Sequence, residues 1–272
     1  MDLLGHFLRV TPGFKGRGRL ARFWLKRPRN HDYRMRKLPA ARGIRCDMSV
    51  PYECMVWLGR EEEDDLAALY HILKPGQTLV DCGANIGVWT LHAAIATGAH
   101  GKIHAFEPNP ATFEKLLHNI RLNALEGRVH ASCIACGEGE DRRPLVCSDE
   151  HNTSRLASGP VENAVMVPIT TLDKALGEIP IHGIKIDVEG YEMRVLKGAY
   201  EILLRSKPWL CVEFNTLLTG SNRLGDWDVH QYLRALGYSC CRMTEAAGAS
   251  AANARPEDWE TTGYCNLFYF IP

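Results

Sequence analysis

A chain of 272 residues can hold one large α/β domain or two small ones. Hydrophobic residues make up 46% of it, enough for a sizeable core, and no apolar run approaches the roughly 20 residues that a membrane-spanning helix needs. The formal net charge is zero, but residues 1–45 hold thirteen Lys and Arg against two Asp and Glu, and the remainder holds nineteen against thirty. We therefore expect a basic N-terminal arm over 1–45 and an acidic domain over 46–272.

The start of the chain and its thiols indicate the cellular compartment. The first seven residues lack the basic start and the apolar core of a signal peptide. The ten cysteines are scattered singly, as reduced core thiols are. Cys133 and Cys136 form a C-x-x-C, but no second pair follows at zinc-site spacing. We expect a cytoplasmic protein whose thiols pack in the core.

The basic arm is open to two interpretations. Its arginines and lysines are interspersed with Leu20, Phe23, Trp24 and Leu25, a pattern compatible with an amphipathic helix on an anionic membrane surface or a nucleic acid. The alternative is an arm that packs on the domain and leaves a solvated basic face. We favour the second interpretation because three glycines between residues 13 and 18 would interrupt a long helix.

Segments typical of strands and helices alternate along the rest of the chain. Residues 44–60 predict a short hairpin, and the acidic run 61–65 begins a helix that lasts to Ile72. Strands are predicted at 78–82, 102–106, 128–135, 182–187 and 209–214, and helices at 88–97, after Pro110 as far as Leu122, and at 172–176, 191–204 and 227–236. A polar stretch within 137–170 predicts a hairpin-like insertion, and residues 239–243 and 264–270 predict a final pair of strands. This order predicts an α/β fold with a doubly wound, mostly parallel sheet and an antiparallel addition at one edge.

Four of the predicted central strands end in an acidic residue: Asp81, Glu107, Asp187 and Glu213. The carboxyl ends of parallel strands meet at one edge of a sheet, where open α/β sheets bind ligands. Carboxylates gathered there are unfavourable unless a ligand uses them. A ligand with an ammonium group and a ribose would do so, because Asp81 can accept from the ammonium and Glu107 from both ribose hydroxyls.

The turn after the first of these strands separates the candidate ligands. Residues 81–87 read D-x-G-x-x-x-G, with Gly83 and Gly87 placed so that backbone can approach a ligand. A dinucleotide site reads G-x-G-x-x-G, and an acid at the strand end would oppose its pyrophosphate. S-adenosylmethionine is therefore favoured over NAD, and a tight turn without a ligand is the remaining alternative.

A set of motifs in this order resembles the FkbM family of S-adenosylmethionine-dependent methyltransferases: VDCGANIG at 80–87, AFEP at 105–108, N-I-x-x-N at 119–123, TLD at 171–173, IKIDVEGYE at 184–192 and VLKGA at 195–199. The resemblance implies a class I methyltransferase fold, a Rossmann-like sheet of seven strands of which one is antiparallel. It also implies O-methylation of hydroxyls on glycans or small natural products. The cofactor site that we expect from it consists of Asp81, Gly83, Ala84, Asn85, Gly87, Glu107, Pro108 and Cys136.

Methyl transfer to a hydroxyl requires an aligned acceptor and often the removal of a proton. The candidate bases are Asp187, Glu189 and Glu213, and we expect Lys185 to face away from Asp187. Helix capping beside Gly190 is the alternative role for Glu189, and it is the role that we favour for Glu192.

Two further hypotheses concern the same rim. Asp187, Glu213 and Asn215 offer hard oxygens that would suit Mg²⁺, although we favour a site without a metal in which a carboxylate binds the hydroxyl. His151 in the predicted insertion is a fourth candidate base if the insertion covers the acceptor. An ordinary exposed loop is the alternative there.

No sequence pattern names the acceptor or the oligomeric state. One alternative function is RNA methylation, with the basic arm as an electrostatic handle and with Phe23 and Trp24 stacking on bases. The other is a cofactor-binding partner protein without catalysis.

Overall fold

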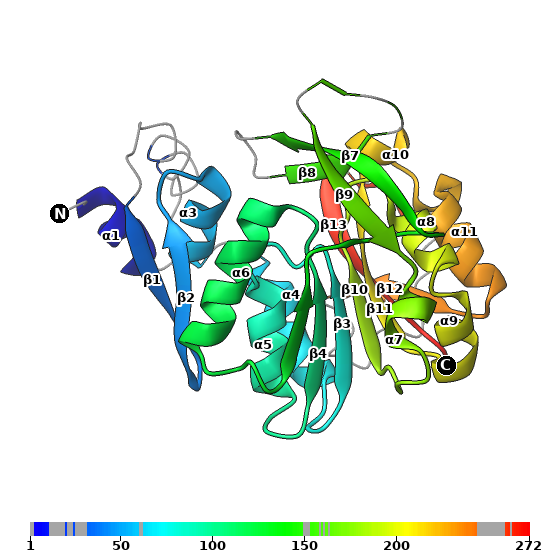
Figure 1. The fold of residues 1–272 in the computed structure, drawn as a ribbon, viewed down its shortest axis with the longest axis horizontal. Coiled ribbons are helices and arrows are strands. Elements are labelled where there is room, and N and C mark those ends of the chain that lie inside the picture. Colours follow the sequence, from blue (N-terminus) through cyan, green and yellow to red (C-terminus); the bar gives the residue numbers. More distant parts are fainter. Residues whose placement is uncertain are drawn as a thin grey trace.

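The computed structural model describes residues 3–10, 20, 24, 32–59, 62–148, 153–157, 159, 161–162, 164–243, 259–261 and 263–272. Its centre is a seven-stranded sheet with helices on both faces (Figure 1). The strands follow the order β12 (Ser239–Arg242), β13 (Tyr264–Phe270), β11 (Trp209–Asn215), β10 (Gly183–Ile186), β3 (Thr78–Cys82), β4 (Lys102–Phe106) and β5 (Val129–Ser132). Within this described sheet, β13 alone runs opposite in direction to the other six strands. The predicted fold class is confirmed.

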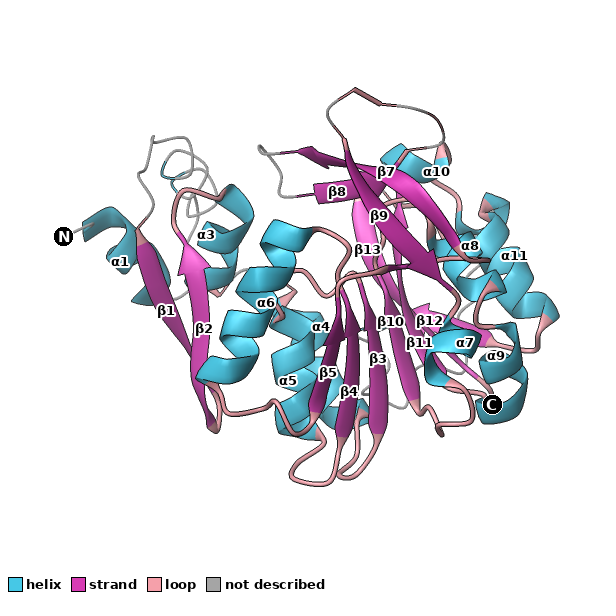
Figure 2. Cartoon of the chain, viewed as in Figure 1, coloured by secondary structure: helices cyan, strands magenta, loops and turns pink. Residues whose placement is uncertain are grey.

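Two layers of helices enclose the sheet (Figure 2). One face carries α4 (Glu63–Ile72), α5 (Val88–Ala96) and α6 (Pro110–Leu122), and the other carries α7 (Leu172–Leu176), α8 (Glu192–Lys197), α9 (Tyr200–Ser206) and α11 (Asp228–Ala235). Strand β3 serves both cores, because Leu79 packs with the first layer and Val80 with the second, and both side chains are fully buried.

The predicted helix over 191–204 is divided into α8 and α9. The division falls at Gly198, where an added Cβ would lie 1.9 Å from the carbonyl oxygen of Gly137. The backbones of Gly198 and Gly137 approach each other closely at this point, and the helix is interrupted there. Beyond β11 the chain forms α10 (Thr216–Thr219) and the short 3₁₀ helix η1 (Leu224–Asp226).

The prediction of a hairpin over 44–60 is wrong. The hairpin lies earlier, between β1 (Tyr33–Leu38) and β2 (Ala41–Asp47), and helix α3 (Pro51–Leu58) follows. Pro51 stands in the first turn, where its missing N–H costs nothing, and Gly59 ends the helix in the left-handed region at φ 74°. These two helix signals outweigh the aromatic content of the segment.

The β1–β2 hairpin is attached to α6 by asparagine side chains. Asn119 Oδ1 accepts a hydrogen bond from the Arg45 backbone N–H at 2.8 Å, and Asn123 Oδ1 accepts one from Gly43 at 3.1 Å. The predicted boundary of the arm at residue 45 thus falls inside β2.

The described part of the arm also packs on the domain. Helix α1 (Leu3–Val10) contacts α3, and Trp24 is buried and stacks on Trp57 of α3 with ring centroids 6.1 Å apart. Trp24 is therefore not available to stack on a base. Phe23, Leu25 and the basic residues between 15 and 29 lie outside the described residues.

A second sheet covers the carboxyl end of the main one (Figure 1). It contains four strands in the order β6 (Ala135–Cys136), β9 (Val165–Thr170), β7 (Asp141–Ser148) and β8 (Thr153–Leu156). The predicted strand over 128–135 is therefore two strands, of which β5 belongs to the main sheet and β6 to this one. Among the described residues, no helix combines the length and the apolar character that crossing a membrane requires.

Candidate active site

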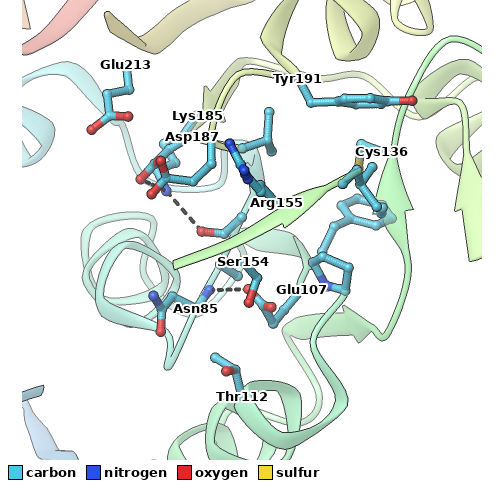
Figure 3. Close-up of a pocket in the computed structure, with 18 of the residues that line it drawn as sticks. Asn85, Glu107, Thr112, Cys136, Ser154, Arg155, Lys185, Asp187, Tyr191 and Glu213 are labelled. Carbon is cyan, nitrogen blue, oxygen red and sulfur yellow. Dashed lines mark hydrogen bonds and ion pairs between the residues drawn. The ribbon is translucent and has the colours of Figure 1, made fainter. Parts of the chain in front are cut away.

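A cavity of about 860 Å³ opens where the carboxyl ends of the main strands meet the second sheet. Its wall comes from the turns after β3 and β4, from the ends of β10 and β11, from β7 and β8, and from α3. Figure 3 shows Asn85 and Glu107 on one side and Asp187, Lys185 and Glu213 on another, with Ser154 and Arg155 between them in this view. The predicted site residues Gly83, Ala84, Pro108, Cys136 and Glu189 line it as well.

The turn after β3 owes its glycines to contacts within the protein. Gly83 has a φ of +80°, and an added Cβ would lie 1.9 Å from the carbonyl oxygen of Asp187. Gly87 has a φ of +98° and faces Leu116, whose Cδ1 would lie 2.8 Å from a Cβ. Both positions thus require glycine whether or not a ligand is bound.

Glu107 is held rigidly in the cavity wall. Its two carboxylate oxygens accept hydrogen bonds from the backbone N–H groups of Asn85 and Asn109, each at 2.9 Å. Burial raises its pKa to about 7. Each carboxylate oxygen can still accept a second hydrogen bond, so the group retains the capacity to bind a pair of hydroxyls.

Asp81 lies behind the cavity wall rather than in it. Its side chain is completely buried, Oδ2 accepts a 2.6 Å hydrogen bond from Thr90 Oγ1, and Oδ1 faces Lys185 Nζ at 3.7 Å. Burial raises the pKa of this carboxyl. The protein therefore supplies its own cation to Asp81, the acid that we expected to meet the ligand's ammonium.

The expectation that Lys185 faces away from Asp187 is wrong. Lys185 Nζ lies 3.1 Å from Asp187 Oδ2 and donates to the Gly83 carbonyl oxygen at 3.1 Å. Burial alone would lower the pKa of this ammonium, but the charges of Asp187 and Asp81 raise it above its ordinary value. A buried lysine thus joins the ends of β3 and β10 beneath the cavity.

Two glutamates complete the acidic wall. The pKa of Glu189 is raised to about 7 by burial and by the charges of Asp187 and Glu192, and its backbone is in the left-handed region at φ 54°. The pKa of Glu213 is raised to about 9 by burial and by the charges of Asp187 and Glu189. At neutral pH, Glu213 is therefore protonated, whereas Glu189 is divided between its two forms. The capping role falls to Glu192, whose Oε1 accepts from the Gly190 N–H at 3.0 Å.

Two of the three residues predicted to suit Mg²⁺ have partners within the protein. Asp187 is paired with Lys185, and Asn215 Oδ1 accepts from the Leu217 N–H at 3.1 Å to begin α10. Across the described ranges, no three His, Cys, Asp or Glu side chains are grouped closely enough to hold a metal ion. His151, the fourth candidate base, lies outside the described residues.

Three charged residues of the site were not predicted as such. The sequence pattern places Lys185 on the opposite face, Glu62 only in the start of a helix, and Arg155 only in a polar insertion. Glu62 and Arg155 both line the cavity. Lys185 could have been found from its position two residues before Asp187, since such residues share a face of a strand. No sequence spacing of this kind indicates that Glu62 or Arg155 belongs to the site.

The strand order and the acid-lined cavity at the carboxyl edge define a class I methyltransferase fold. The chain belongs to the FkbM methyltransferase family, because residues 81–240, more than half of its length, match the methyltransferase FkbM domain.

Individual proteins are similar to parts of this chain. The hexuronic acid methyltransferase AglP of Haloferax volcanii is 30% identical over 145 residues, which make up 51% of this chain and 56% of that protein. Methyltransferase 1 of Beauveria bassiana is 28% identical over 207 residues, or 66% of this chain and 75% of that protein. A crystal structure of methyltransferase FkbM from Methylobacillus flagellatus KT superposes with a TM-score of 0.48 at 16% identity, and covers 80% of this chain and 54% of its own. The chain spans little more than half the length of the Haloferax relative.

Family membership implies S-adenosylmethionine as the cofactor, and the residues present fit it. Glu107 has free acceptor capacity for the ribose hydroxyls, and Phe106, Ile134 and Cys136 provide apolar wall nearby for a base. The lining holds five carboxyl groups, Glu62, Glu107, Asp187, Glu189 and Glu213, which favour a ligand with cationic groups. When bound, S-adenosylmethionine supplies an electrophilic methyl group.

Proposed function

We propose that this protein is an S-adenosylmethionine-dependent O-methyltransferase whose acceptor is a hydroxyl of an acidic sugar in a glycan. The observation that carries the proposal is the pairing, in one cavity, of a carboxylate suited to act as a base with a guanidinium suited to bind an anionic acceptor. The similarity to a hexuronic acid methyltransferase supports the same class of acceptor.

Glu189 is the proposed base. It lines the cavity, it is not joined to Lys185 as Asp187 is, and its pKa of about 7 suits proton transfer at neutral pH. Glu189 would take the proton of the acceptor hydroxyl when the methyl group of S-adenosylmethionine is transferred to the hydroxyl oxygen, with S-adenosylhomocysteine as the leaving group. Protonated Glu213 donates a hydrogen bond to the acceptor, and the Asp187–Lys185 pair fixes the wall behind it.

Arg155 is the proposed binding residue for the acceptor's carboxylate. It lies on β8 in the cavity wall and is exposed, and no hydrogen bond or ion pair joins its side chain to another described residue. The other cation of the described lining, Lys185, is buried against Asp187 and Asp81. A free guanidinium above an otherwise acidic wall suits a planar carboxylate.

The test is methyl transfer to matched oligosaccharides that end in either glucuronic acid or glucose. We expect methylation of the acidic sugar, detected by mass spectrometry as the gain of one methylene, and a KM about 10- to 100-fold higher for Arg155→Gln with this acceptor. Arg142→Gln, on the exposed surface of β7 outside the cavity, is the control. RNA methylation in the same assay, or cofactor binding without turnover on any acceptor, would contradict the proposal.

A further inference from the structure

We infer that Glu62, rather than Asp81, binds the amino group of the methionine part of S-adenosylmethionine. The inference rests on the proposed use of this cofactor and extends it to a residue 19 positions before the signature turn. Glu62 immediately precedes α4 and lies in the cavity wall together with Gly83, Ala84 and Asn85 of that turn.

Hydrogen bonds from two distant parts of the chain hold the Glu62 carboxylate in place. Trp89 in the first turn of α5 donates its indole N–H to Glu62 Oε2 at 2.7 Å, and Asn266 on β13 donates its side-chain amide to Glu62 Oε1 at 2.8 Å. The Glu62 backbone is in the left-handed region at φ 49°, which costs free energy for a residue other than glycine. An acid held in this way at a ligand cavity is pre-organised for a partner.

Each Glu62 oxygen accepts one hydrogen bond from the described protein, and a carboxylate can accept about four. The remaining acceptor capacity borders the cavity. Burial raises the pKa of Glu62 to about 7, so an ammonium group that approached it would restore the ionised form and gain a charge-assisted hydrogen bond.

The other acids near the turn are already engaged. Asp81 is completely buried between Thr90 and Lys185, Asp187 is paired with Lys185, and Glu107 is placed for a ribose. Among the described acids beside the turn, Glu62 and Glu107 line the cavity without a protein cation within ion-pairing distance, and Glu62 is the one of these two that is not placed for the ribose.

Two nucleosides that differ in the amino acid part distinguish this role. S-adenosylhomocysteine carries the ammonium group, whereas 5′-methylthioadenosine lacks the whole amino acid end. For Glu62→Gln we expect calorimetry to show S-adenosylhomocysteine bound about 10- to 100-fold more weakly and 5′-methylthioadenosine bound within about twofold of wild type. Retained binding of 5′-methylthioadenosine also shows that the variant is folded, and Glu62→Asp, which keeps the charge but shortens the side chain, should lose less.

Asp65→Asn is the matched control, because Asp65 Oδ2 accepts from the same Asn266 amide at 2.9 Å but does not line the cavity. It should bind both nucleosides like wild type. Equal weakening of both nucleosides by Glu62→Gln, or no weakening of either, would overturn the inference while leaving the proposed function intact. A wild-type protein that binds neither nucleoside would overturn both.

Discussion

At the level of single residues, the carboxyl groups that line the cavity differ in their hydrogen-bond and ion-pair partners. Asp187 faces a lysine, Glu107 accepts two backbone N–H groups, and Glu213 has a buried oxygen without a hydrogen-bond partner among the described residues. Glu189 differs from all three, because its carboxyl is partly desolvated but has neither an ion pair nor a side-chain hydrogen bond to another described residue. A group in that state exchanges a proton most readily near neutral pH.

We therefore predict that Glu189→Gln lowers kcat by about 10²- to 10⁴-fold and leaves the affinity for S-adenosylhomocysteine unchanged. In the wild type, the rate should rise with pH through about 7, because ionisation creates the base. Steady-state kinetics over pH 5.5–8.5 and calorimetry on the same preparations measure both effects. Glu201→Gln, exposed in the first turn of α9, is the control. Unchanged kcat in the Glu189 variant would transfer the role of base to another group.

The acids at the strand ends could be predicted from the sequence, but their partners could not. The end of each apolar segment predicts the end of a strand, and this places four acids there: Asp81, Glu107, Asp187 and Glu213. The prediction for Lys185 is wrong because residues two positions apart, such as Lys185 and Asp187, share one face of a strand. The register that places Lys185 opposite Asp81 depends on tertiary structure. Glu62 is more remote still, since its anchor Asn266 lies 204 residues away in the chain.

At the scale of elements, the ends of β3 and β10 are brought together by a glycine. The carbonyl oxygen of Asp187 occupies the space where a side chain at residue 83 would begin. This contact lets Lys185 reach both Asp81 and the Gly83 carbonyl. The spacing of two strands and the charge balance beneath the cavity therefore depend on the same backbone contact.

Gly83→Ala should therefore lower the free energy of unfolding far more than Gly→Ala does at a left-handed glycine with open space around it. We predict a loss of about 3 kcal/mol or more in the free energy of unfolding, because the added Cβ forces the strands apart and the backbone strain adds to it. Gly76→Ala is the matched control: Gly76 has nearly the same φ, +81°, but open space around it, so we expect a loss of only about 1–2 kcal/mol. Urea unfolding measures both, and equal losses would show that the contact does not matter.

The order of strands and helices can be predicted from the sequence, but the points at which a predicted helix or strand is divided in two cannot. Strands and helices from residue 78 onward lie close to the predicted positions, because apolar periodicity records which residues are buried. Helix α3 was mistaken for a hairpin although Pro51 and Gly59 mark its ends. The break at Gly198 depends on its close approach to the Gly137 backbone, and the break between β5 and β6 depends on the pairing of β6 with β9. Neither contact leaves a pattern in the local sequence.

At the scale of the whole molecule, the acidic cavity makes stability depend on pH. The pKa values of Glu62, Glu107 and Glu189 are raised to about 7 and that of Glu213 to about 9, in each case chiefly by burial. In the unfolded chain these groups are ionised above about pH 4.5. Between pH 6.5 and 8.5 the native state therefore holds more protons than the unfolded state, and stability falls as pH rises.

We predict that the free energy of unfolding of the ligand-free protein decreases by about 2–4 kcal/mol from pH 6.5 to pH 8.5. The buried His92 and His104, whose pKa values are about 4, make stability change in the opposite direction, and because the pKa of an unfolded histidine is about 6.5 they offset only the lower end of this window. Urea unfolding at several pH values measures the slope, and Glu213→Gln should make it shallower. A slope that is zero or positive in the wild type would contradict the prediction.

The hydrogen bonds from Asn266 to Glu62 and Asp65 have a consequence for synthesis. The turn after β3 and helix α5 leave the ribosome early, but the amide that positions Glu62 belongs to β13, near residue 270. A nascent chain that has formed the first half of the sheet cannot yet hold this carboxylate in place. On the inferred role of Glu62, the cofactor reaches its full affinity only after residue 266 has been translated, so the early strands must persist on their own packing until then.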